Sequence, residues 1–271
     1  MANPPTLGPV SSLGEFLRLR RGQVRPQDVG LVPGPRRRVD GLRREELAAL
    51  AGISADYYLR IEQGRNANPS EQILDALARA LRLDDAGRAH LHQLARENRP
   101  VYDGAETVSA DVLTLIDQLG VPAVVVGRCV DCLASNTAAR LLSPNFVSGT
   151  NVLRQLFLDP AERALHADWE DVTAGVVGGL RQVAGGEARD PRLDDLVQEM
   201  CALSPRFTML WHRADVGYRP AGESHMRHPV VGELRLRRTR LPIPDSGGQH
   251  LHLYHAVPGT DTAARLASLQ R

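Results

Sequence analysis

The stretch RREELAALAGISADYYLRIEQG, residues 43–64, is typical of two short helices joined by a tight turn. Its first part repeats apolar residues at helical spacing until Gly52, a residue that commonly ends a helix. Its second part begins at Ser54, a residue type that caps helix N-termini, and ends at Gly64, which suits a C-terminal cap. A helix, a turn of three residues beginning with glycine and a second helix form the helix-turn-helix plan.

The second helix of this pair has an inner and an outer side. Ile53, Tyr58 and Ile61 share the side that we expect to face a core. The outward positions are Ala55, Asp56, Leu59, Arg60, Glu62 and Gln63. A small residue, an acid and an arginine near the start of a helix suit the reading of bases in a major groove. Asp56 leaves two interpretations open: it accepts a hydrogen bond from cytosine, or it is an acid favoured by the helix N-terminus.

Three further helical patterns surround this pair, and a polar segment containing Pro and Gly follows them near residue 100. Short helices joined by tight turns predict an all-α helix-turn-helix bundle for the first third of the chain. The predicted divisions are a flexible N-terminus at 1–12, the helical domain at 13–99, a linker at 100–108 and a second domain at 109–265.

The second domain has strand patterns at both ends and helical patterns between them. VPAVVVG (121–127) and CVDCLAS (129–135) predict a hairpin, and three more strands are expected at 224–229, 232–243 and 249–257. Between them we expect a short helix at 136–142, one long helix beginning at Asp159-Pro160 and reaching residue 185, and helices at 190–203 and 204–215. This order predicts an α+β fold with an antiparallel sheet.

Composition and charge restrict the class of protein further. The 271 residues carry a net charge of +1, and every one of the 33 basic residues is arginine. Residues 1–99 hold 16 arginines and 12 acids, whereas residues 100–271 hold 17 and 20, so the helical domain is the basic part. Without a membrane-length apolar run, a signal peptide or a disulfide framework among three cysteines, we expect a cytoplasmic protein with no membrane partner.

The chain also resembles a known family. RREELAALAGISADYYLRIEQGRNANPSEQILDALARAL resembles the helix-turn-helix domain of the XRE group, and more closely that of the MmyB-like bacterial regulators. Past residue 108, the segments NVLRQLFLDPAERALHADWEDV, LSPRFTMLWHRADV, RHPVVGELRLRRTRLPIP and LYHAVPGT resemble the MmyB-like ligand-binding domain. Together these segments span residues 13–265 in the family's order.

The resemblance implies roles for residues of the helical domain. Ala55, Asp56 and Arg60 would face base edges, and Tyr57 would lie near a phosphate. Arg44, Ser54, Gln63 and Arg65 would contact phosphates, and Arg18 would pair with Glu62 to join the first and third helices. The loop residues Arg36, Arg37 and Arg38 form either a phosphate-binding arm or a solvated loop. Contacts to phosphates add affinity for DNA without choosing a sequence.

For the second domain the resemblance implies a PAS-like fold that binds ligands of fatty-acyl type. Candidate wall residues are Trp169, Phe207, Met209, Leu210 and Trp211, although residues of these types are more often plain core. Arg227, followed by His228, either holds a carboxylate or forms a surface ion pair. Asn136 lies at a strand-to-helix corner, where it suits an N-cap. Ser135 stands where many relatives have tryptophan, so the ligand of a relative does not transfer directly.

Metal and catalytic chemistry find little support. Cys129 and Cys132 would point to opposite faces of a strand, and His250 and His252 share a strand face without further ligands. No nucleophile elbow, phosphate-binding loop, metalloprotease motif or dinucleotide fingerprint is present. We therefore expect no metal, no cofactor and no enzyme.

These observations predict a transcription regulator of the nucleoid that binds a double-stranded DNA operator as a homodimer. Its PAS-like domain would sense a small apolar ligand, with a fatty acid as one candidate. The alternative is a DNA-binding regulator whose second domain dimerises or docks a protein and holds no ligand.

Overall fold

The structure of the chain is a computed structural model. It describes residues 12–32, 39–65, 68–96, 101–102, 104–186, 189–217 and 222–270. Nearly all of the expected flexible N-terminus, together with Arg36, Arg37 and Arg38, lies outside the described residues. The chain forms two compact units, one of residues 1–102 with 181–217 and one of residues 103–180 with 218–271. Each unit is described by itself.

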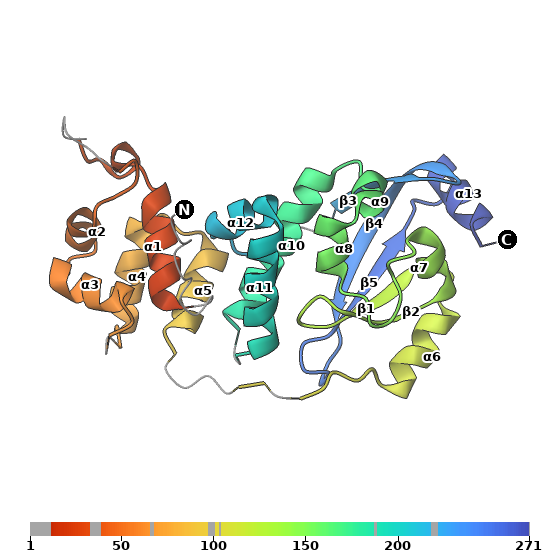
Figure 1. The fold of residues 1–271 in the computed structure, drawn as a ribbon, viewed down its shortest axis with the longest axis horizontal. Coiled ribbons are helices and arrows are strands. Elements are labelled where there is room, and N and C mark those ends of the chain that lie inside the picture. The colour runs from red at the N-terminus through yellow and green to blue at the C-terminus, as the bar shows by residue number, and fades with distance from the viewer. Residues whose placement is uncertain are drawn as a thin grey trace. The chain divides into compact units, whose positions relative to one another are not determined.

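The first unit is helical, as predicted (Figure 1). Its elements in the first third of the chain are α1 (Leu13–Gln23), the 3-10 helix η1 (Pro26–Val29), α2 (Arg44–Leu50), α3 (Ala55–Glu62), α4 (Glu71–Ala80) and α5 (Asp85–Leu94). Ser12, Ser54 and Asp84 cap α1, α3 and α5 by accepting a backbone N–H. The first helix continues one residue past Gly22 and ends at Gln23.

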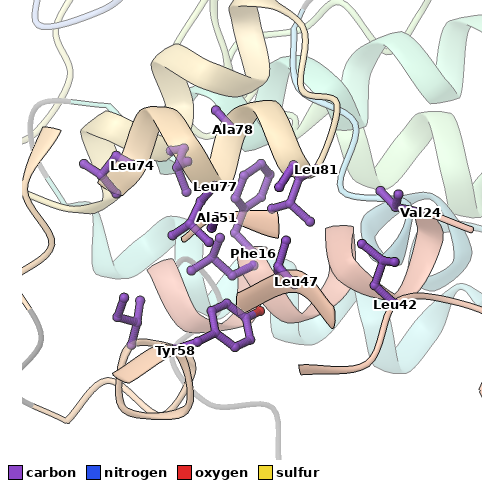
Figure 2. Close-up of a cluster of buried hydrophobic side chains, with 14 of the residues drawn as sticks. Phe16, Val24, Leu42, Leu47, Ala51, Tyr58, Leu74, Leu77, Ala78 and Leu81 are labelled. Atoms are coloured by element: carbon purple, nitrogen blue, oxygen red, sulfur yellow. The ribbon is translucent and has the colours of Figure 1, made fainter. Parts of the chain in front are cut away.

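A single apolar cluster holds these helices together. Phe16, Leu47, Tyr58, Leu77 and Leu81 point into it from α1, α2, α3, α4 and the end of α4, and each is almost completely buried (Figure 2). Burying such side chains stabilises a fold by roughly 1.5–3 kcal/mol each. The inward side predicted for the helix after the turn is therefore confirmed for Tyr58 and Ile61, and Ile53 packs partly against the same cluster.

Two helices from later in the chain belong to the first unit as well. These are α11 (Pro191–Leu203) and α12 (Pro205–His212). Gln23 on α1 donates its amide to the carbonyls of His212 and Arg213, at 3.0 and 2.7 Å. Gly185 lies so close to His90 that a Cβ would approach its ring to 2.0 Å, so this contact requires a glycine.

The second unit is built on a five-stranded antiparallel sheet (Figure 1). Its strands are β1 (Ala123–Val126), β2 (Cys132–Ser135), β3 (Gly222–His228), β4 (Gly232–Pro242) and β5 (His250–His255), in the order β2-β1-β5-β4-β3. The hairpin and the three later strands predicted from the sequence are all confirmed. Cys129, however, lies in the turn before β2, because the strand begins only at Cys132.

The two faces of the sheet carry different apolar clusters. Val124, Leu234, Leu236 and Tyr254 belong to the larger cluster, on what we call the inner face. Val125 and its neighbours on β5 belong to a smaller cluster with α6, on the outer face. Because successive side chains of a strand point to opposite faces, every residue of the sheet can be assigned to one face from its register.

The helices of the second unit include one correction. They are α6 (Ala110–Gln118), α7 (Thr137–Leu142), α8 (Val152–Leu158), α9 (Pro160–Leu165), α10 (Trp169–Ala184), whose last turn belongs to the first unit, and α13 (Asp261–Ser268). The single long helix predicted from Asp159 is wrong, because the chain leaves the helix at His166 and bridges Met226 of β3. There Ala167 donates its N–H to the His225 carbonyl at 2.8 Å. The structure also has α6, α8 and α13, for which we had predicted no helix.

Within the described part of the chain, none of the helices is both long and apolar enough to span a membrane.

Candidate functional site

The helix α3 is held with one side inward by its caps and its core residues. Ser54 Oγ accepts the N–H of Tyr57 at 3.1 Å, which fixes the start of the helix. At the other end Gly64 takes a left-handed conformation, with φ 67°, and donates its N–H to Ile61. Tyr58 and Ile61 are buried, and Asp56, Arg60 and Gln63 lie on the exposed side of the helix. The expected outward position of Glu62 is wrong, because its side chain turns toward arginines of α1 and α2 and is 3% exposed.

The outward face of α3 carries the side chains predicted to read DNA. Asp56, Arg60, Gln63 and Arg65 are exposed, whereas Ala55 and Tyr57 are half-buried. Asp56 Oδ2 pairs with Arg60 at 3.2 Å, one turn along the helix. The Arg60 guanidinium also lies 5.9 Å from the centre of the Tyr57 ring. Asp56, for which two interpretations were open, is therefore the ion-pair partner of Arg60.

Behind this face, Glu62 joins three helices. Arg21 of α1 donates to both carboxylate oxygens, from Nε at 3.2 Å and from NH2 at 3.0 Å. Arg44 of α2 donates to Oε1 through Nε and NH2, at 3.2 and 3.1 Å. The expected pair of Arg18 with Glu62 is wrong: Arg18 is exposed, and Arg21, one turn further along α1, reaches the carboxylate.

The environment of Glu62 keeps it charged. Burial raises the pKa of its carboxyl, but the hydrogen bonds from Arg21 and Arg44 outweigh burial, so its pKa lies below the usual value. The Glu62 side chain is 3% exposed, whereas that of Arg44 is 50% exposed. Arg44 therefore keeps an accessible guanidinium edge next to the reading helix while it supports Glu62.

In the second unit, the side-chain amide of Asn136 makes its hydrogen bonds to the backbone of the fold. Its Oδ1 accepts from the N–H groups of Ala123 and Ala139, at 3.1 and 2.9 Å. Its Nδ2 lies 2.8–3.2 Å from three carbonyls. These carbonyls belong to Ile116, Leu119 and Val121. The expected N-cap is confirmed for α7, and the amide has no donor left for a ligand.

Arg227 and His228 lie on opposite faces of β3. The register places Arg227 opposite Glu233 on the outer face, where it is exposed. His228 is buried, its Nδ1 accepts the N–H of Val230 at 3.2 Å, and its Nε2 then donates to the Leu141 carbonyl at 3.0 Å. That imidazole fastens the turn between β3 and β4 to α7.

The three aromatic candidates for a ligand wall belong to different units. Trp169, at the start of α10, donates its ring N–H to the Leu156 carbonyl at 2.8 Å and is covered by the Arg163 guanidinium at 4.3 Å. Phe207 and Trp211 stack on α12 in the first unit, with ring centres 5.9 Å apart. Both are fully buried, so they form core in that unit.

Metal and thiol chemistry has no geometric support among the described residues. Cys129 and Cys132 are both buried and form no disulfide, and burial raises the pKa of Cys132 to about 11. No group of three or more potential metal ligands occurs in the described ranges.

A set of basic residues on the inner face was missed by motif reading. Arg238 and Arg240 continue the alternation of Leu234 and Leu236 along β4, so they point to the same face as the core. Arg240 lies directly opposite His252 on β5. The pattern is visible in LRLRRTR (234–240), where every second residue is first leucine, at 234 and 236, and then arginine, at 238 and 240.

Taken together, the α2–turn–α3 pair with its outward polar face defines a helix-turn-helix DNA-binding protein, joined to an α+β domain. Residues 12–91 match the family model of a helix-turn-helix domain. Residues 108–269 match the model of the MmyB-like transcription regulator ligand binding domain. Because the second match covers more than half of the chain, the protein belongs to the MmyB-like transcription regulators. Among curated proteins, none matches this chain.

Proposed function

We propose that this regulator binds a double-stranded operator as a homodimer and places α3 in the major groove, with its ligand-binding domain sensing a small apolar molecule. The observation that carries the DNA half is the division of α3. Tyr58 and Ile61 anchor one side, and the predicted reading residues Asp56 and Arg60 stand exposed on the other. One such helix reads about half a site, and a dimer sets the spacing of two halves.

The Asp56–Arg60 pair does not prevent base reading. An exposed pair one turn apart stabilises a helix by about 0.3–0.5 kcal/mol. A bidentate contact from arginine to guanine contributes about 1–3 kcal/mol of discrimination. Arg60 therefore gains more from a base than it loses by leaving Asp56, which is then free to accept from a cytosine amine. Ala55, at the start of the helix, leaves room for a close approach.

Phosphate contacts would surround this reading face. Ser54, Gln63 and Arg65 lie at the two ends of α3, and Arg44 offers its accessible edge from α2. Tyr57 would flank a phosphate, with its ring beside Arg60. Arg37 and Arg38, which precede α2 in the sequence and lie outside the described residues, are proposed as further phosphate contacts. Such contacts position the protein without choosing a sequence.

For the ligand-binding domain we propose a small apolar ligand of fatty-acid type. The family match supports a ligand, and the apolar inner face of the sheet supports an apolar body. A ligand alters DNA binding only by its different affinity for two arrangements of the protein. In this proposal the ligand changes the spacing or orientation of the paired reading helices, and the protein acts in the cytoplasm, on the nucleoid.

The central experiment is selection of bound fragments from genomic DNA, with and without a lipid extract. We expect one enriched motif with two half-sites and a change in recovery when the extract is added. Arg60→Ala should relax the preference at one base position by about 1–3 kcal/mol. Arg65→Ala should weaken all sequences alike and lower the salt dependence by about one unit.

Arg88→Ala is the matched control, because Arg88 is an exposed arginine on α5 that pairs with Asp75. It should leave both the motif and the salt dependence as in the wild type. If Arg60→Ala keeps the wild-type preference, the assignment of the reading face is wrong. Native mass spectrometry tests the sensor: a co-purified lipid supports it, whereas an empty domain in a tight dimer supports a dimerisation or docking module.

A further inference from the structure

The inner face of the sheet changes from apolar to basic along β4. Leu234 and Leu236 are buried in the inner-face cluster, and Arg238 and Arg240 follow at the same alternation, half-buried. On β5, His252 lies directly opposite Arg240. A long charged side chain usually reaches water from an outer face, so two arginines on the core side of one strand need an explanation.

His252 lies among basic side chains. The groups that influence His252 electrostatically are Arg238, Arg240 and His250, all of them cationic or potentially so. Burial and, to a smaller extent, these neighbours lower the pKa of His252 to about 3. Arg240 donates to Nε2 of His250 at 2.6 Å, so that imidazole is also neutral. We name Arg238, Arg240, His250 and His252 the basic row.

Two members of the basic row are open to a partner. Within the described ranges, no hydrogen bond or ion pair joins the side chains of Arg238 and His252 to another residue. A half-buried cation without an ion-pair partner, as Arg238 is within the described ranges, is costly in a folded domain. An anion that enters the row would therefore be favoured by the charges already assembled there.

The surroundings of the basic row indicate that its ligand also has an apolar part. Val124 of β1 lies opposite His252 on its other side, so the row borders the apolar cluster directly. Tyr254 follows on β5 opposite Arg238, and its ring lies 5.7 Å from that of Phe146. A molecule with an anionic head and an apolar body would place each end against matching groups.

We propose that the basic row binds the oxyanion head of an apolar ligand, a carboxylate or a phosphate. This inference rests on the proposed sensor function and adds the site of the ligand's head. Arginine suits this role because its planar fork donates two parallel hydrogen bonds to such a group. The neutral His252 adds one ring N–H, and Arg240 turns from His250 toward the anion. Arg227, on the outer face, has no part in this site.

Titration calorimetry of the full-length protein tests the site with three probes that share one chain length: decanoate, decanol and decyl phosphate. Native mass spectrometry first establishes that the domain is empty. We expect the wild type to bind decanoate at least ten-fold more tightly than decanol. Arg238→Gln and Arg240→Gln should each lose at least ten-fold for decanoate and less than three-fold for decanol. Decyl phosphate then tells which oxyanion is preferred.

Arg235→Gln and Arg237→Gln are matched controls, because both arginines are exposed on the opposite face of β4. They should bind decanoate as the wild type does, and circular dichroism checks that each variant folds. Arg240→Lys keeps the charge without the fork and should fall between wild type and Arg240→Gln.

Three results would overturn the proposal. The first is equal binding of decanoate and decanol by the wild type, which removes the head site but leaves a sensor of apolar molecules. The second is decanoate binding that Arg238→Gln and Arg240→Gln do not change. The third is no binding of any probe; if DNA selection also ignores the lipid extract, the sensor function fails with it.

Discussion

Replacing Glu62 with alanine should lower the free energy of unfolding of the helical unit by about 3 kcal/mol. Glu62 accepts four hydrogen bonds from two arginines, and its side chain is 3% exposed. Removing one partner of a buried ion pair typically costs 3–5 kcal/mol, because the other charge stays buried. Arg21 is 14% exposed and keeps its bond to the Leu42 carbonyl, so the lower end of that range applies.

The same geometry ranks three arginines of α1 and α2 by their effect on stability. Arg21→Ala should cost about 2–3 kcal/mol, because it leaves Glu62 with only its half-exposed partner. Arg44→Ala should cost no more than about 1 kcal/mol, since an exposed pair contributes little. Arg18→Ala should stay within about 0.5 kcal/mol of the wild type, because that side chain is exposed and away from Glu62.

Urea denaturation followed by circular dichroism measures all four variants. A double-mutant cycle on Arg21 and Glu62 isolates their coupling. The sign of the pH dependence adds an independent check. Because the folded pKa of Glu62 is lowered, its contribution is present above the unfolded pKa and is lost as pH falls through the folded value. A loss below 1 kcal/mol for Glu62→Ala, or equal losses for Arg18→Ala and Arg21→Ala, would refute this reasoning.

Four further substitutions test other parts of the fold. Gly14→Ala should destabilise the helical unit by about 3 kcal/mol in the same denaturation assay, because the new Cβ would lie 2.1 Å from the Glu62 carbonyl oxygen. Gly22→Ala is the matched comparison: open space surrounds Gly22, so this change should stabilise the unit by about 0.5–1 kcal/mol. Burial raises the pKa of Glu15 to about 7, so its contribution to stability is complete below about 4.5 and is lost as pH rises through 7. Glu15→Gln should therefore flatten stability over that window by about 1–2 kcal/mol, allowing for its partial exposure, and an unchanged pH profile would contradict the assignment. Asn136→Ala should cost the sheet unit about 3 kcal/mol in thermal unfolding, because it leaves several buried backbone groups unpaired; a Tm equal to that of the wild type would count against this role.

Local patterns accounted for much of the helical unit and of the sheet. Ser54 and Gly64 marked the ends of α3 because capping depends on residue type and on a few neighbouring backbone groups. Strand-forming residues bounded by turn residues located β1, β3, β4 and β5, because both signals are local. The sequence pattern did not predict the break in the helix at His166, since neither glycine nor proline stands there. At this point the chain bridges Met226, and Ala167 donates its N–H to the His225 carbonyl in place of a helical acceptor.

The sequence by itself determined that α3 has Tyr58 inside and Asp56 and Arg60 outside, because a helical period sorts residues onto faces. It could not determine which arginine of α1 meets Glu62, since Arg18 and Arg21 share a face and differ by one turn. The height at which two helices cross depends on close approach at Gly14, which is a property of the tertiary structure. In the same way, alternation placed Arg238 and Arg240 on one face of β4, and only the packing of the sheet made that face the inner one.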